Sequence, residues 1–347
     1  MSEPQPVKVA VVGYGYWGPN IVRNVSERPE LELWGLCELS AERADRFRSR
    51  FPGVRVSPSF EAVLADPDVE AVSIATPPST HYSLVRAALE AGKHVLVEKP
   101  LANTAAEAEH LVEIAERQGL VLMPGHTFLY SPAVNKIRDL IVGGALGEIY
   151  FVTSARMNLG IYQPDGVIRD LLPHDLSILL HWLDGRVTTV AASGSTVFQQ
   201  GVPETAFLTL GFEGGTTANI QISWLAPRKV RQTVVVGSKQ MVVYDDMALD
   251  GAVRVYDRGV DFELQPSASF GEHQLTYRSG DMVAPRLDPA EPLGLELADF
   301  AAAVRTGRTP RSHAGLGTEI VAVIEAAHES LAENGRPVAV QPSLSRA

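Results

Sequence analysis

The chain has 347 residues, of which 45% are hydrophobic and 20% charged, and a formal net charge of −11. The length suits two domains, the composition excludes a disordered chain, and the acidic balance argues against nucleic acid or an anionic membrane as a partner. A single cysteine, Cys37, excludes an intrachain disulfide, and with no signal peptide or membrane span apparent we expect a cytoplasmic protein.

Residues 9–12 (VAVV) predict a buried parallel strand that leads into the glycine-rich turn GYGYWG. Gly13 can adopt the backbone angles of a sharp turn, and Gly15 lets the main chain approach a pyrophosphate closely. Gly18 lets the helix expected over residues 17–26 pack on the strand, with its first amides facing the phosphates. The spacing indicates a dinucleotide-binding turn, and a glycine turn without a ligand is the alternative for the motif taken alone.

A second strand is expected over residues 30–37, and Glu38 follows it about twenty residues after Gly18. An acidic side chain at this place accepts hydrogen bonds from the adenosine ribose of NAD and repels the 2′-phosphate of NADP. We therefore expect NAD as the cofactor, with NADP less favoured. Ser40 and Arg43 can soften this preference, and an ordinary surface carboxylate is the alternative for Glu38.

Strands and helices continue to alternate as far as residue 125. This alternation predicts a doubly wound parallel sheet, a dinucleotide-binding Rossmann domain, over residues 1–125. Helices are expected over residues 40–50, 59–65, 80–91 and 104–117, and strands over residues 70–75, 93–97 and 120–123.

The rhythm changes after residue 125, where strand-like runs joined by short turns predict a large, open, mostly antiparallel sheet. We expect residues 126–347 to form a second α/β domain for substrate binding and oligomerisation, with the site in the cleft between the domains. An apolar sheet face that few helices can cover favours a homodimer or homotetramer. Strands are expected over residues 148–157, 188–197, 206–212, 217–224, 230–236, 241–244 and 253–256, helices over 131–142, 291–305 and 317–334, and a surface loop over 267–289.

Three short motifs carry residues capable of chemistry. ATPPSTHY (residues 75–82) and EKPLA (residues 98–102) each follow a predicted strand, and RDLLPHDLSILLHWL (residues 169–183) opens a helix in the second domain. Ligands of doubly wound sheets lie outside the carboxyl ends of the strands, so the first two motifs are well placed for binding.

These motifs, together with GYGYWG and the closing pattern LELADFAAAVRTGRTP, resemble in order and spacing the Gfo/Idh/MocA oxidoreductases, the glucose–fructose oxidoreductase and inositol dehydrogenase family. The resemblance implies a Rossmann domain, a second α/β domain with an open sheet, and NAD(P)-dependent oxidation or reduction of sugars and cyclitols. GHTFLYSP (residues 125–132) and DLLPHDLSI are most similar to the branch that acts on nucleotide-linked sugars.

The resemblance implies that Lys99, Asp170 and His174 form the catalytic group. A histidine titrates near neutral pH, so His174 can accept the proton of a sugar hydroxyl while hydride leaves for the nicotinamide. Lys99 can stabilise developing alkoxide charge, and Asp170 can orient the imidazole or hold the substrate hydroxyl. The structural alternatives are a solvated Lys99, a helix cap at Asp170 and a polar His174 opposite a leucine stripe.

Arg169 departs from the branch, where an aromatic residue is expected, and it suits recognition of a carboxylate or phosphate, or else a surface ion pair. No metal is expected. We expect cofactor contacts from Gly13, Tyr14, Gly15, Tyr16, Trp17, Gly18, Glu38, Thr76, Pro77, His81, Glu98 and Lys99. Substrate contacts are expected from Lys99, His126, Tyr130, Arg156, Asn158, Tyr162, Arg169, Asp170 and His174.

The sequence thus predicts an NAD(P)-dependent oxidoreductase that transfers hydride between nicotinamide and a secondary alcohol or ketone of a sugar, preferably a nucleotide-linked one. A free-sugar or inositol dehydrogenase is the alternative enzyme. A regulator that senses NAD(H) or a sugar without turnover is the alternative of another class, and the intact catalytic group argues against it.

Overall fold

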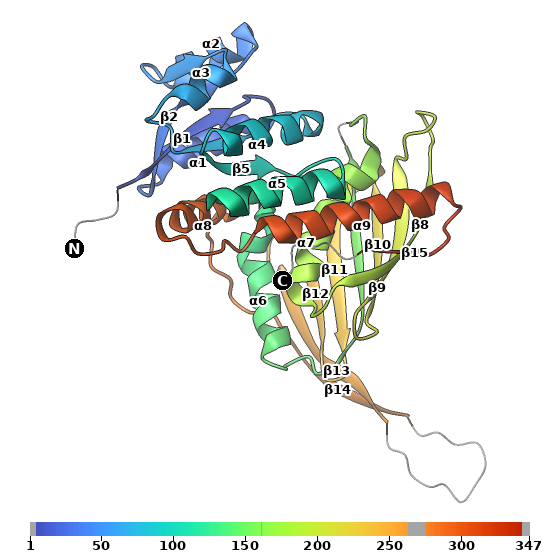
Figure 1. The fold of residues 1–347 in the computed structure, drawn as a ribbon. Helices are drawn as coiled ribbons and strands as arrows, with labels where there is room; N and C mark the ends of the chain where they lie inside the picture. Colours follow the sequence, from blue (N-terminus) through green and yellow to red (C-terminus); the bar gives the residue numbers. More distant parts are fainter. Residues whose placement is uncertain (1–4, 161, 263–274, 342–347) are drawn as a thin grey trace, which may run out of the picture. The chain divides into compact units, whose positions relative to one another are not determined.

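The computed structural model describes residues 5–160, 162–262 and 275–341, which form two compact units. The first unit contains the chain up to Ser131 and residues 290–325, and the second contains residues 132–289 and 326–340. The sequence suggests one boundary at residue 125, whereas residues 290–325 group with the first unit. Figure 1 shows the chain in colours that follow the sequence.

The first unit is built on a six-stranded sheet in the order β3-β2-β1-β4-β5-β6, and every pairing in it is parallel. The apolar strands are buried from both sides, as expected for a doubly wound sheet, so the predicted Rossmann fold is confirmed. The sheet's order reverses between β1 and β4, which is where such sheets bind dinucleotides. The strands are β1 (Val7–Val12), β2 (Leu31–Cys37), β3 (Arg55–Ser57), β4 (Ala71–Ile74), β5 (His94–Glu98) and β6 (Leu122–Gly125).

The helices of the first unit differ in how they begin. Ser40, Ser59 and Thr104 cap α2, α3 and α5, because each side chain accepts a hydrogen bond from an amide of the first turn. Trp17 occupies the N-cap position of α1 and provides no such acceptor. These helices are α1 (Gly18–Glu27), α2 (Ala41–Arg50), α3 (Phe60–Ala65), α4 (His81–Glu90), α5 (Ala105–Gln118) and α8 (Pro292–Thr306), with short helical turns η1 (Pro78–Thr80) and η2 (Thr127–Tyr130).

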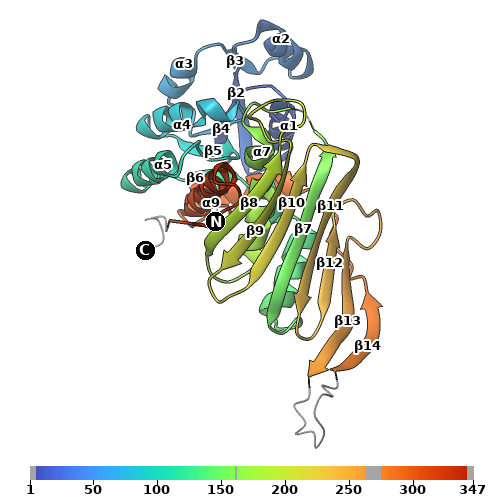
Figure 2. The same ribbon diagram turned by 90° about the vertical axis from the view of Figure 1, so that its right-hand side faces the viewer.

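The second unit is built on a nine-stranded sheet in the order β14-β13-β12-β11-β7-β10-β9-β8-β15, which faces the viewer in Figure 2. β7 and β10 run parallel and the remaining pairings are antiparallel, which confirms the predicted mostly antiparallel sheet. The strands are β7 (Ile149–Leu159), β8 (Val187–Ser195), β9 (Thr205–Phe212), β10 (Thr217–Ser223), β11 (Leu225–Gly237), β12 (Met241–Asp245), β13 (Val253–Phe262), β14 (Leu275–Val283) and β15 (Val338–Ala339).

The strand β14 corrects the surface loop predicted over residues 267–289. Its polar composition suggested a loop, but its backbone pairs with β13 from Leu275 to Val283, and that ladder overrides the weak local preference. Residues 267–274 of the predicted loop lie outside the described residues.

One face of the second sheet carries α6 (Pro132–Val142), which contacts β12, and α7 (Gly166–Trp182), which contacts β7, β9 and β10. Side chains on the other face, among them Phe151, Phe207 and Met241, remain partly exposed. The last long helix, α9 (Ala314–Ala332), is divided between the two units after Glu325.

The helix α7 begins earlier than its motif suggests. Its N-cap is Asp165 and its first residue is Gly166, so Asp170 lies inside the helix and the alternative of a capping role is wrong. Pro173 also lies inside the helix, where its missing N–H removes one backbone hydrogen bond. Packing against the rest of the second unit therefore keeps α7 helical across Pro173, although proline disfavours helix interiors.

A buried ion pair holds α7 on the sheet of the second unit. Nε of Arg156, on β7, donates to Oδ2 of Asp175 at 2.7 Å, and the two side chains are 4% and 2% exposed. The Ser154 hydroxyl donates to Oδ1 of Asp175 at 2.7 Å and also lies 2.9 Å from Oγ1 of Thr233. These contacts fix the rotation of α7 about its axis. They therefore also fix the direction in which the side chains on the rest of the helix point.

Candidate active site

The glycine turn after β1 is shaped by two close contacts and one open position. A Cβ added to Gly13, whose φ is +92°, would lie 2.7 Å from the carbonyl oxygen of Ala75, and one added to Gly18 would lie 2.3 Å from the carbonyl oxygen of Gly13. A Cβ added to Gly15 would meet no atom within 4 Å. The protein's own packing therefore requires Gly13 and Gly18, whereas Gly15 leaves space beside the uncapped first turn of α1. This arrangement fits a dinucleotide pyrophosphate.

Glu38, at the end of β2, is buried and extensively hydrogen-bonded. Oε2 accepts from the amide of Tyr14 at 2.8 Å, and Oε1 accepts from the amide of Ser40 at 2.7 Å and from Nη2 of Arg43 at 2.9 Å. Burial alone would raise the pKa of this carboxyl, but the bonds from Arg43 and the two amides outweigh it and lower the pKa. The carboxylate has one acceptor position left for a ribose hydroxyl, and the guanidinium of Arg43 is the exposed charge beside it.

The aromatic residues of the turn divide into one core residue and two exposed ones. Tyr14 is buried edge-on against Phe47, with ring centroids 5.4 Å apart, and its amide is occupied by Glu38. Tyr14 therefore packs in the core of the first unit, and its cofactor contact stays a prediction. Tyr16 and Trp17 are 76% and 43% exposed and meet edge to face at 5.7 Å, so these two remain candidates to cover a cofactor.

The loops after β4 and β5 are joined through His81. Its Nδ1 lies 2.7 Å from the carbonyl oxygen of Pro100 and its Nε2 lies 3.0 Å from that of Thr76. A neutral imidazole donates to only one of them, and burial followed by the charge of Lys99 lowers the pKa of this histidine. His81 thus braces the loops that carry Thr76, exposed Pro77 and Lys99, and its direct cofactor contact stays a prediction.

Lys99 follows β5. Two residues near it, Glu98 and His126, have side chains for which burial disfavours the charged form. Loss of hydration raises the pKa of Glu98 to about 7, although Lys99 favours its charged form. His126 is buried with both ring nitrogens unpaired, and burial, Lys99 and His313 lower its pKa to about 3. His126 therefore presents a neutral imidazole near Lys99.

Tyr130 has its hydroxyl occupied within the first unit. It donates to Oδ2 of Asp299 at 2.6 Å and accepts from the amide of Ser312 at 3.2 Å. Burial and the bond to Asp299 raise its pKa. Tyr130 thus links η2 to the segment around α8, and its substrate contact stays a prediction.

In the second unit, α7 brings Asp170 and His174 together on one side of the helix, one turn apart and both half-buried. Nε1 of Trp224 donates to Oδ2 of Asp170 at 3.0 Å, and the Ser177 hydroxyl donates to the carbonyl of His174 at 2.9 Å. Leu176 and Leu179, on the other side, are buried. The i, i+4 spacing thus places a carboxylate and an imidazole on the same side of α7.

The other predicted substrate contacts of the second unit have different surroundings. Arg156 belongs to the buried ion pair with Asp175, and its substrate contact stays a prediction. Asn158 is half-buried and follows Arg156 on the same face of β7. Tyr162 is partly exposed and donates its hydroxyl to Oε1 of Glu204 at 2.8 Å. Arg169 is half-buried. The pKa of His328 is lowered to about 4, mainly by the burial of His328 and then by the positive charge of Arg169.

Trp224 and Glu204 belong to this constellation and were missed by sequence reasoning. Neither lies in a motif, and both act on partners distant along the chain. A tryptophan at the end of the strand predicted over residues 217–224 was the one available signal, and by itself it favours core packing.

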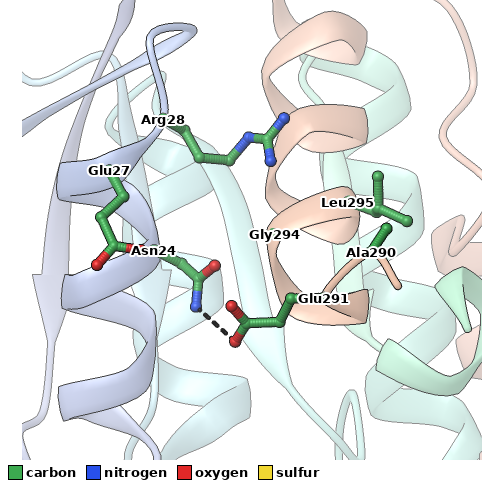
Figure 3. A pocket seen from close by; sticks show the side chains of 7 residues that line it. All are labelled: Asn24, Glu27, Arg28, Ala290, Glu291, Gly294 and Leu295. Atoms are coloured by element: carbon green, nitrogen blue, oxygen red, sulfur yellow. Dashed lines mark hydrogen bonds between the residues drawn. The ribbon is translucent and has the colours of Figure 1, made fainter. Parts of the chain in front are cut away.

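Figure 3 shows the residues that line a hollow of about 300 Å³ in the first unit. It is lined by Asn24, Glu27 and Arg28 from the last turns of α1 and by residues at the start of α8. Arg23 pairs there with Glu291 at 2.6 Å. Because the glycine turn precedes the opposite end of α1, roughly 15 Å along the helix, this hollow is not the dinucleotide site.

Among the described residues, no group of three or more His, Cys, Asp or Glu side chains is arranged to hold a metal ion. Within the same residues, no helix has the length and apolar character needed to cross a membrane.

Comparison with protein families gives two matches along the chain. Residues 7–126 match the Gfo/Idh/MocA oxidoreductase family model, an NAD-binding Rossmann fold, and residues 134–243 match the model of the Gfo/Idh/MocA C-terminal domain.

The chain is also similar to individual enzymes and structures. It is 30% identical to dTDP-3,4-didehydro-2,6-dideoxy-alpha-D-glucose 3-reductase of Saccharopolyspora spinosa, over 62% of this chain and 68% of that one. It is 30% identical to UDP-N-acetylglucosamine 3-dehydrogenase of Acidithiobacillus ferrooxidans, over 73% of this chain and 78% of that one. The crystal structure of GenD2 from gentamicin A biosynthesis in complex with NAD aligns with a TM-score of 0.82 at 25% identity, over 99% of this chain and 98% of that one.

The two glycines of the turn are expected to respond differently to a methyl group. Gly15→Ala should leave the unfolding midpoint unchanged and weaken NAD binding tenfold or more, because the methyl enters the space that the pyrophosphate approaches. Gly18→Ala should lower the unfolding midpoint, because its methyl meets the carbonyl of Gly13. Thermal unfolding and calorimetric NAD titration of both variants test this, and unaltered NAD affinity of Gly15→Ala would contradict the assignment.

Proposed function

The chain belongs to the Gfo/Idh/MocA family of oxidoreductases, and on that premise we propose that it transfers hydride between nicotinamide and a secondary alcohol or ketone of a nucleotide-linked sugar. The observation that carries the proposal is the position of Asp170 and His174 on one side of α7, four residues apart. The named activities of the relatives on dTDP- and UDP-linked hexoses support this substrate class.

His174 is the proton acceptor in this proposal. When a secondary alcohol is oxidised, the bound nicotinamide accepts the hydride. The imidazole of His174 accepts the hydroxyl proton and returns it in the reverse direction. Asp170 orients the imidazole and stabilises the imidazolium that forms.

Lys99 is the electrostatic partner. Its ammonium hydrogen-bonds the reacting oxygen and stabilises alkoxide character as the proton leaves. Burial raises the pKa of Glu98 to about 7 and keeps His126 neutral, so burial weakens the negative charge of Glu98 beside Lys99.

Arg169 supports the nucleotide-linked substrate. A guanidinium binds phosphate oxygens in a bidentate manner, which suits the diphosphate of a nucleotide sugar. Tyr162 and Asn158 remain candidate contacts for the sugar, and Tyr16 and Trp17 for the cofactor.

A spectrophotometric panel of dTDP- and UDP-hexoses, free sugars and inositols with NAD tests the proposal. It should give NADH with nucleotide sugars. Turnover confined to free sugars or inositols would contradict the substrate class, and NADH binding without any turnover would indicate a sensor.

NAD is expected to bind more tightly than NADP, because Glu38 accepts from the ribose and repels a 2′-phosphate. Glu38→Ala should narrow the difference between the two affinities. Arg43→Ala is the matched control and should widen it, since it removes the cation that attracts a 2′-phosphate. Calorimetric titration of each variant with both cofactors measures this, and tighter NADPH binding by the unaltered protein would refute the preference.

His174→Ala is expected to reduce turnover about a hundredfold to ten-thousandfold, the usual contribution of a positioned acid–base group. NAD affinity should be nearly unchanged. The pH profile of alcohol oxidation should lose its acidic limb, because that limb reports protonation of the imidazole. His181→Ala, on the same side of α7 but hydrogen-bonded to Asn135, is the control and should keep turnover within about twofold. Near-normal turnover of His174→Ala would place the proton acceptor elsewhere.

The partly exposed face of the second sheet is proposed to form a subunit interface, because side chains such as Phe151 and Phe207 leave apolar surface in solvent. Light scattering at micromolar concentration should give a homodimer or homotetramer. Phe207→Lys should shift the mass toward the monomer, whereas Leu249→Lys, exposed in the turn after β12, should not. A monomeric unaltered protein would exclude this interface.

A further inference from the structure

We propose that Trp224 is a positioning residue for Asp170 and that Tyr162 and Glu204 brace it from behind. This inference rests on the proposed function, since it assigns a role at the same site. It adds Trp224 and Glu204, which neither the motifs nor the family resemblance identified, and gives Tyr162 a second role.

The indole of Trp224 fixes one oxygen of the Asp170 carboxylate. Nε1 donates to Oδ2 at 3.0 Å, and an indole N–H has no acceptor capacity, so the direction of this bond is unambiguous. Trp224 is buried, which protects the bond from competition by water. Gly160 provides the space, since an added Cβ would lie 2.4 Å from Cδ1 of the indole.

Tyr162 connects the indole to a second buried carboxylate. Its ring centroid lies 5.4 Å from that of Trp224, and its hydroxyl donates to Oε1 of Glu204 at 2.8 Å. The backbone of Trp224 also donates to the carbonyl of Glu204 at 2.9 Å. Trp224 is thus held on both its ring and its main chain.

Glu204 anchors this chain of contacts to the loop between β8 and β9. Its carboxylate accepts from the amides of Val197, Phe198 and Gln199. Burial opposes its ionisation, but the amides and the Tyr162 hydroxyl outweigh burial and lower its pKa to about 2. The anchor therefore remains ionised throughout the neutral range.

The arrangement predicts that losing the indole N–H misplaces the Asp170 carboxylate without removing it. Trp224→Phe keeps most of the buried ring and should reduce kcat about 10- to 100-fold, with little change in the KM of the sugar or the affinity for NAD. Tyr162→Phe and Glu204→Gln should reduce kcat by smaller factors, because the bond to Asp170 itself remains.

Trp182→Phe is the matched control, because Trp182 is also buried and its indole donates to a backbone carbonyl, that of Val134, at 2.8 Å. It should lower the unfolding midpoint about as much as Trp224→Phe but leave kcat within about twofold. In an Asp170→Ala background, Trp224→Phe should cause no further loss of kcat, since it acts through the missing carboxylate. Equal kcat for the two tryptophan variants, or additive losses in the double variant, would overturn the proposal.

A nuclear magnetic resonance readout separates this proposal from the proposed function. The indole N–H resonance of Trp224, assigned by its absence in Trp224→Phe, should shift in Asp170→Ala, whereas that of Trp182 should not. The shift is expected even if no sugar is turned over, in which case the proposed function fails and the contact stands. An unmoved Trp224 resonance in a folded Asp170→Ala protein would overturn the positioning role, whatever the activity.

Discussion

Two opposite charges buried between α7 and β7 hold the second unit's candidate residues in place. Asp175 cannot leave the guanidinium of Arg156 without one charge remaining in a region that water does not reach. Breaking such a buried pair by removing one partner costs about 3–5 kcal/mol. The pair therefore fixes α7 in rotation as well as in position. A rotation of one residue, about 100°, would turn His174 toward the sheet and carry Asp170 away from Trp224.

The first unit organises its residues by strand direction instead. Because all six strands run parallel, the segments that follow β1, β2, β4, β5 and β6 emerge at the same edge. The glycine turn, Glu38, Thr76, Lys99 and His126 each follow one of these strands. The uncapped amides of α1 and the open space at Gly15 favour an anion beside the glycine turn. The buried carboxylate of Glu38 disfavours an anion at its own position, after β2.

Burial controls charge in both units. Glu38 and Glu204 remain ionised although buried, because backbone amides and neighbouring side chains donate to them. Glu98 and His126 lack comparable compensation, and their pKa values move toward the neutral forms. The two sets differ in the number of hydrogen-bond donors around each group. Glu38 and Glu204, with several donors, stay charged and hold loops in place, whereas Glu98 and His126 can hold or release protons near Lys99.

The sequence by itself determined the Rossmann sheet, the mostly antiparallel second sheet and the position of the glycine turn, because these depend on apolar periodicity and on residues adjacent in the chain. The family resemblance of its motifs also predicts a role for Asp170 and His174, and the helix α7 places the two residues four positions apart on one side. Only the tertiary structure decided that β14 is a strand, that Asp170 lies inside α7, and that Tyr14, His81, Tyr130 and Arg156 are occupied by protein partners. Trp224 meets Asp170 across 54 residues and Tyr162 meets Glu204 across 42. Contacts over such separations depend on how strands and helices pack, and no local pattern of residue types encodes them.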